Sequence, residues 1–208
     1  AQVHRATLHD GSRVAVKIQR PDLRPTIEAD LELLGSLARR AARWIPAVGP
    51  LAPVDLVAEF ADSLRRELDF RLEAQAAREV AAALADEPDL WVPGVIGGLS
   101  SERVLTTSYS SGRKLGTDWP REPDARRRIA DLLLRTYLRQ VVEVGVFHAD
   151  LHPGNVFLDE RGRVCLHDFG IVGRLAADER EHLQGLLLAL VARDARWTTD
   201  VYLAMGVL

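Results

Sequence analysis

Two carboxylates and one amide in the C-terminal half could bind a metal ion and accept a proton. Asp150 and Asn155 lie five residues apart in the run VFHADLHPGN, and Asp168 follows thirteen residues after Asn155. A carboxylate can take the proton of a hydroxyl group or water. Carboxylate and amide oxygens also suit Mg²⁺, which completes its octahedron with phosphate oxygens and water. The spacing predicts Asp150 as a base and Asn155 with Asp168 as ligands of Mg²⁺.

This order of residues is typical of a kinase catalytic loop. His148, Asp150 and Asn155 fit H-x-D-x-x-x-x-N, and Asp168 begins an Asp-Phe-Gly triplet that holds metal in kinases. Apolar runs at 156–158 and 164–166 predict a β-hairpin between the two motifs. Each motif alone is weak, and the alternative makes Asp150 and Asp168 solvated loop acids.

A lysine near the N-terminus fits the same layout. Residues 3–8 and 13–19 predict two strands joined by a turn, and the second strand contains VAVK, which matches the strand whose lysine pairs nucleotide phosphates. Alternation puts Ala15 and Lys17 on one face, where a small alanine leaves room for a flat base. Lys17 and Lys114 are the only lysines among 27 basic residues, so we read Lys17 as functional; the alternative is a solvated strand lysine.

Three acids are candidates to pair with that lysine. A kinase fold needs one helix glutamate for this role, and residues 55–85 carry an apolar stripe that predicts one continuous helix. Glu67, Asp69 and Glu73 lie on it. Glu67 and Glu73 are six positions apart, which turns them about 240° around the helix, so both cannot make the same contact. We favour Glu73 or Glu67, and for each acid the alternative is a solvated helix face.

Four segments together resemble the UbiB/AarF family of atypical kinases: Ala1–Ala6, Val14–Pro21, Glu67–Phe70 and His148–Asn155. The likeness runs from residue 1 to about residue 175. It implies a kinase-like fold that binds ATP and Mg²⁺, with activity linked to quinone or isoprenoid-lipid metabolism at a membrane. Family members carry an upstream K-x-G-Q motif and an alanine-rich loop, which this sequence lacks apart from Ala1. The chain is therefore expected to be a fragment of a longer protein.

The resemblance also assigns site residues. It implies the nucleotide and metal roles for Lys17, Asp150, Asn155 and Asp168, and an acidic E-x-D motif matched by Glu67 and Asp69. Ser108 and Tyr109 fall at the expected hinge, where backbone groups would bind the adenine edge. Serines stand where family members often have acids, which puts side-chain recognition of the ribose in doubt.

The remaining pattern predicts an α+β, two-lobed, protein-kinase-like fold. Strands are expected at 92–96 and 103–109, and a helix at 124–144 should bury Ile129, Leu133, Tyr137 and Val141. A last helix should begin near Asp178. We expect a small antiparallel sheet lobe with inserted helices over residues 1–112, and a mainly helical lobe over residues 113–208.

Composition limits the possible partners and compartments. A net charge of −3 with mixed signs gives no basic stripe for nucleic acid. One cysteine, Cys165, excludes an intramolecular disulfide, fits a reducing compartment, and is expected to be a small core residue. The most apolar run, Leu186–Ala192, is too short to span a bilayer. We expect a cytoplasmic protein, peripheral to a membrane in its full-length form, whose partners are a nucleotide and a lipid or quinone precursor.

Three functions fit these residues. The first is a Mg-ATP-dependent phosphotransferase or ATPase of UbiB/AarF type. The second is a small-molecule phosphotransferase of the aminoglycoside or choline kinase type, against which the Glu67–Phe70 segment argues. The third is a catalytically silent nucleotide-binding scaffold, which would not need Asp150. Only about ten residues separate Asp168 from the last helix, so a peptide acceptor is not favoured.

Overall fold

The computed structural model describes residues 1–45, 52–117 and 120–207. The chain divides into two compact units that are interleaved in sequence. The first unit comprises Ala1–Gln75 and Val95–Tyr109, and the second comprises Ala76–Gly94 and Ser110–Leu208. The assignment of residues 1–112 and 113–208 to consecutive lobes stays a prediction.

The first unit contains a three-stranded antiparallel sheet. Its strands are β1 (Gln2–Thr7), β2 (Arg13–Ile18) and β4 (Val104–Ser108), in the order β1-β2-β4. The predicted N-terminal hairpin is confirmed, and Lys17 lies opposite Val3 and Leu105 in the register. The strand expected at 92–96 is wrong, because Val95 makes only an isolated bridge to Thr107.

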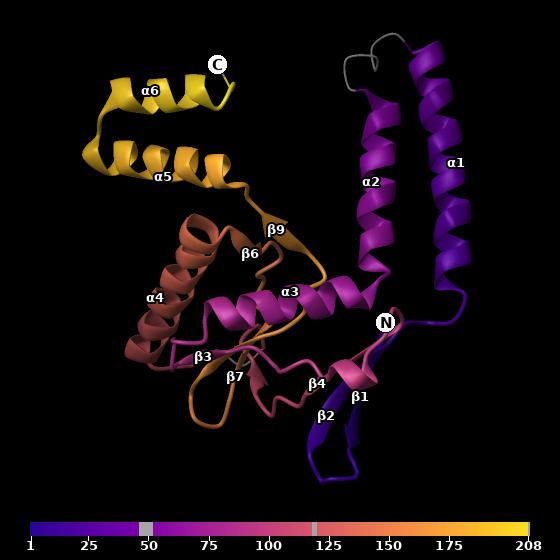
Figure 1. Cartoon of the computed structure of the whole chain (residues 1–208), viewed down its shortest axis with the longest axis vertical. Helices are drawn as coiled ribbons and strands as arrows, with labels where there is room; N and C mark the ends of the chain where they lie inside the picture. The colour runs from indigo at the N-terminus through magenta and orange to yellow at the C-terminus, as the bar shows by residue number, and fades with distance from the viewer. Residues whose placement is uncertain (46–51, 118–119, 208) are drawn as a thin grey trace. The chain divides into compact units, whose positions relative to one another are not determined.

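Helices α1 (Leu23–Trp44) and α2 (Pro53–Glu67) follow the hairpin and lie side by side (Figure 1). The single helix expected over 55–85 is wrong. The helix stops at Glu67, and α3 (Phe70–Ala83) begins after two residues. The backbone N–H of Phe70 bonds to Glu102 O at 2.9 Å instead of continuing the helix. Leu68 and Phe70 are both 5% exposed, so the turn buries two side chains that one straight helix would separate.

The second unit has a small mixed sheet with the order β3-β8-β7-β5. Its strands are β3 (Leu90–Trp91), β5 (Arg113–Lys114), β7 (Val156–Leu158) and β8 (Val164–Leu166). The predicted hairpin is confirmed as β7 and β8. Cys165 is fully buried in β8, as expected of a small core residue. A second ribbon pairs β6 (Val146–His148) with β9 (Val172–Arg174).

Helix α4 (Pro123–Arg139) continues into a π-helical turn over Gln140–Val144. The helix predicted at 124–144 is confirmed, but its buried stripe is shifted: Ile129, Leu132, Thr136 and Gln140 are the buried positions. The π turn ends at Gly145, whose φ of 76° suits glycine. Helices α5 (Ala177–Ala192) and α6 (Ala195–Ala204) complete the unit. None of the helices in the described part of the chain is long and apolar enough to cross a membrane.

Candidate active site

The segment from His148 to Asn155 forms an ordered loop between β6 and β7. The Asn155 side-chain amide donates to Asp150 O at 3.0 Å, and the Asn155 backbone N–H donates to His152 O at 2.9 Å. Asn155 is 7% exposed, whereas the Asp150 side chain is 49% exposed. The loop therefore holds the side-chain amide of Asn155 in its interior and leaves the carboxylate of Asp150 open to an incoming molecule.

His148 anchors this loop from a fully buried position. Its Nε2 bonds to His167 O at 2.9 Å, and its Nδ1 accepts the backbone N–H of Asp150 at 3.2 Å. Because Nδ1 accepts a hydrogen bond, Nε2 is the ring nitrogen that donates to His167 O. His148 therefore braces the loop, because both ring nitrogens hold the segments that carry Asp150 and Asp168.

Gln140 holds His148 in turn, and the sequence did not single it out. Gln140 is fully buried; its Oε1 accepts the His148 N–H at 3.1 Å and its Nε2 donates to Thr136 O at 3.2 Å. The sequence feature that could have identified Gln140 is its place on the same helix stripe as Ile129, Leu132 and Thr136, because a polar residue at a core position needs a hydrogen-bond partner.

The β7–β8 hairpin brings Asn155 and Asp168 to the same end of the sheet. His167 N donates to Asn155 O at 2.9 Å, directly beyond the pairing of Val156 with Leu166. Asp168 has a φ of 61°, in the left-handed region that few aspartates adopt. Such a backbone is retained at functional sites when the surrounding structure holds it in place.

These two residues fit a Mg²⁺ ion that binds together with a nucleotide. The described residues contain no group of three His, Cys, Asp or Glu side chains that could hold a metal by itself. Because the Asn155 nitrogen is bonded to Asp150 O, the amide oxygen is the atom left for a cation. One amide oxygen and one carboxylate are a typical protein share for Mg²⁺, which takes its other ligands from phosphates and water.

His167 and Cys165 are structural neighbours of the loop. The Cys165 Sγ lies 3.2 Å from His167 Nε2. Burial raises the pKa of the Cys165 thiol to about 12. Burial also lowers the pKa of His167 to about 4, which outweighs the opposing effect of the Asp168 charge. Both groups are neutral at physiological pH, so neither serves as a nucleophile or a cation here.

In the first unit, Lys17 pairs with Glu73. The Nζ of Lys17 lies 2.9 Å from both Glu73 carboxylate oxygens, and these side chains are 21% and 8% exposed. The Phe70 ring lies 5.3 Å from Nζ. Of the two glutamates left open by the sequence, the structure selects Glu73, since the break before Phe70 places it on a separate helix from Glu67.

The other acids lie elsewhere. Glu67 ends α2 and is exposed. Asp69 accepts the Arg71 backbone N–H at 3.0 Å, and hydrogen bonds from the Arg71 guanidinium lower the pKa of the Asp69 carboxyl. Asp69 therefore caps the start of α3 in this structure. Nucleotide contacts by Glu67 and Asp69 stay a prediction.

The expected hinge residues lie at the end of β4. Ala15 faces Thr107 and Val14 faces Ser108 in the register of β2 and β4. The Tyr109 N–H donates to Arg13 O at 3.1 Å, and the Arg13 guanidinium lies 5.4 Å from the Tyr109 ring centroid. The Tyr109 N–H thus already has a hydrogen-bond partner within the sheet. Recognition of adenine by Ser108 and Tyr109 stays a prediction.

Known proteins resemble this chain over nearly its whole length. Residues 1–201 match the ABC1 atypical kinase-like domain. An uncharacterised protein of Mycobacterium tuberculosis is 38% identical over 99% of the chain and 43% of its own length. A probable protein kinase UbiB of Vibrio atlanticus is 34% identical over 99% of the chain and 39% of its own length. The chain thus spans about two fifths of these curated relatives.

A solved structure supports the fold. The Mycobacterium tuberculosis protein Rv3197, determined in complex with erythromycin, aligns with a TM-score of 0.77 and 28% identity. The alignment covers 97% of this chain and 50% of that protein. Together with the domain match, this confirms the predicted kinase-like α+β fold and the resemblance from which it was inferred.

Proposed function

Because this chain belongs to the ABC1 atypical kinase-like family, we propose that it binds Mg-ATP and transfers or hydrolyses the γ-phosphate. The observation that carries the proposal is the ion pair of Lys17 and Glu73, which joins residues 56 apart in the sequence. Ordering a lysine against a nearly buried carboxylate costs desolvation and side-chain entropy. Such an arrangement is useful where the ammonium must face phosphate oxygens in one fixed position.

Each residue has a distinct part in the proposed reaction. Lys17, oriented by Glu73, binds phosphate oxygens of the nucleotide. Asn155 and Asp168 would hold Mg²⁺, which neutralises phosphate charge when bound. Asp150 accepts the proton of the attacking hydroxyl or water, and its 49% exposed side chain is accessible to an acceptor. His148 keeps the Asp150 backbone in place through the bond to Nδ1.

The segment after Asp168 favours a small acceptor over a peptide. Only eight residues separate Asp168 from the start of α5 at Ala177, and three of them form β9, which pairs with β6. So short a segment, three of whose residues belong to a strand, leaves little chain with which to hold a substrate peptide. We therefore propose water, a small molecule or a lipid of the quinone or isoprenoid class as the acceptor. The lipid class rests on the family resemblance alone.

Two matched substitutions test nucleotide binding and chemistry separately. Asp168→Asn removes a charge that Mg²⁺ needs, so the rise in melting temperature that Mg-ATP causes in the wild type should disappear. Asp150→Asn should keep that rise and lose about 10²-fold or more of ATP turnover. Asp200→Asn, an exposed acid on α6, is the control.

Each outcome separates the candidate functions. An unchanged response of Asp168→Asn to Mg-ATP would refute the metal assignment. Full turnover by Asp150→Asn would refute the base. Wild-type protein that binds Mg-ATP without turnover, with or without lipid, would favour the silent scaffold. Phosphorylation of an amino alcohol or aminoglycoside would favour the second type of phosphotransferase.

A further inference from the structure

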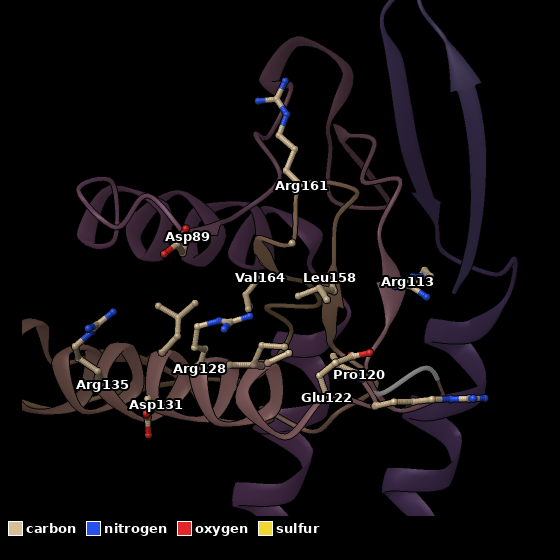
Figure 2. A pocket seen from close by; sticks show the side chains of 15 residues that line it. Asp89, Arg113, Pro120, Glu122, Arg128, Asp131, Arg135, Leu158, Arg161 and Val164 are labelled. Carbon is tan, nitrogen blue, oxygen red and sulfur yellow. The ribbon is translucent and has the colours of Figure 1, made fainter.

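The second unit contains a large pocket away from the catalytic loop. Its volume is about 950 Å³, and it lies between α4, the β7–β8 hairpin and the start of β3 (Figure 2). Of its 15 lining residues, five are arginines: Arg113, Arg121, Arg128, Arg135 and Arg161. The whole chain has 25 arginines in 208 residues, which is 27 basic residues less Lys17 and Lys114. One lining residue in three is therefore arginine, against about one in eight overall.

Helix periodicity explains part of this enrichment. Arg128 and Arg135 are seven residues apart, so they lie on the same face of α4 with a rise of about 10 Å between them. Figure 2 shows both side chains extending toward the side of Val164 and Leu158, whereas the carboxylate of Asp131 points the other way. Arg161 comes from the turn of the β7–β8 hairpin, and Figure 2 shows its guanidinium extending away from Arg128.

The charges around the pocket are not balanced. Five arginines and three acids, Asp89, Glu122 and Asp131, give the lining a formal charge of +2, although the chain as a whole carries −3. Arg135 donates to Glu87 at 3.3 Å. Among the described residues, no side-chain hydrogen bond or ion pair joins Arg128 or Arg161 to another group. An anion placed here would balance the charge of Arg128.

The floor of the pocket is apolar. Val164 is fully buried, and Ile129 and Leu132 are 7% and 8% exposed. Guanidinium groups bind phosphate through two parallel hydrogen bonds, and an apolar floor accommodates hydrocarbon. A volume of 950 Å³ falls in the range of small-molecule sites, about 300–1,000 Å³. Arginines that merely solvate a surface do not require a concave apolar floor.

We propose that this arginine pocket binds a small soluble organic phosphate, that is, a phosphate ester with an apolar body. The site is separate from Asp150, Asn155 and Asp168, and it does not depend on the proposed function. Its anion would lie against Arg128 and Arg135, and its hydrocarbon against Leu158 and Leu132.

Hydrogen exchange measured by mass spectrometry can test this site with n-hexyl phosphate as the probe. The experiment is done without nucleotide and with EDTA, which removes metal-dependent binding near Asp168. The expected result is slower exchange in peptides that cover residues 120–135 and 158–164, with no change at 148–155. Methyl phosphate should bind at least several-fold more weakly, because it lacks the hydrocarbon that the floor would bury.

Matched arginine variants complete the test. Arg128→Gln and Arg135→Gln should each weaken n-hexyl phosphate binding about tenfold or more, since each removes charge-assisted hydrogen bonds. Arg127→Gln, one residue along α4 and outside the pocket lining, should bind like the wild type. Arg161→Gln is a second control: its guanidinium extends away from Arg128, so this variant should also bind like the wild type.

Several results would overturn the proposal. Equal weakening by Arg127→Gln would show a general charge effect, and protection confined to 148–155 would place the phosphate in the catalytic loop. Equal affinity for n-hexyl phosphate and hexanoate would show that phosphate is not selected. Binding only to vesicles that contain phosphatidic acid, and not to n-hexyl phosphate, would make the ligand a membrane headgroup. Mg-ATP affinity should be unchanged in Arg128→Gln whether or not the chain proves to be a kinase.

Discussion

Replacing Gln140 with leucine should destabilise the second unit and loosen the catalytic loop. The side chain is fully buried and makes two hydrogen bonds, to His148 N at 3.1 Å and to Thr136 O at 3.2 Å. Losing both costs about 1 kcal/mol each, and a buried N–H without a partner costs about 1–3 kcal/mol. Leucine has a similar size and recovers some apolar burial. We expect the free energy of unfolding to fall by about 3 kcal/mol, which is roughly 6–12 °C in melting temperature for a chain of this length.

Two measurements check this expectation. Thermal or urea unfolding gives the stability change, and hydrogen exchange at the His148 amide gives the local effect, which should be faster in Gln140→Leu. The control is Gln184→Leu, because Gln184 makes a comparable bond to Val142 O at 2.7 Å from an exposed position on α5. A control change within about 0.5 kcal/mol of zero is expected for such a surface site. If Gln140→Leu is no more destabilising than Gln184→Leu, the bracing argument is wrong.

Three further predictions concern other parts of the structure. Glu73→Gln should weaken Mg-ATP binding about tenfold, because a neutral amide no longer pairs with the strand lysine; Glu59→Gln, at an exposed position on α2, should not. The pKa of His167 is about 4 in the folded protein, below its unfolded value of 6.5, so the free energy of unfolding that depends on this group is fully present above pH 6.5 and is lost as the pH falls toward 4. In urea unfolding, the stability of His167→Gln should therefore vary less with pH than that of the wild type. A methyl group at Gly173 would overlap the phenylalanine ring of β6, so Gly173→Ala should cost about 1–3 kcal/mol in urea unfolding, whereas Gly98→Ala has open space and should cost little.

Residue type and spacing over short stretches of the sequence were sufficient to predict the motifs and most of the helices and strands. The β1–β2 and β7–β8 hairpins could be predicted because alternation and turn residues act over a few positions. The short catalytic loop joined Asn155 to Asp150, and the β7–β8 hairpin brought Asn155 and Asp168 to the same end of the sheet. The buried Cys165 followed from its place in an apolar strand. These features depend on neighbours in the chain, so residue type and spacing were informative.

Features that depend on distant segments were decided only by tertiary packing. The helix breaks before Phe70 because the Phe70 N–H bonds to Glu102 O and its ring is buried, and Glu102 is far away in the sequence. That break, and not helical spacing, put Glu73 against Lys17. The pairing of Gln140 with His148 likewise required the π turn and Gly145 to fold the chain back. Residue type and spacing identified which groups could do chemistry, whereas the burial of side chains remote in sequence selected their partners, because desolvation is determined by the whole packed structure.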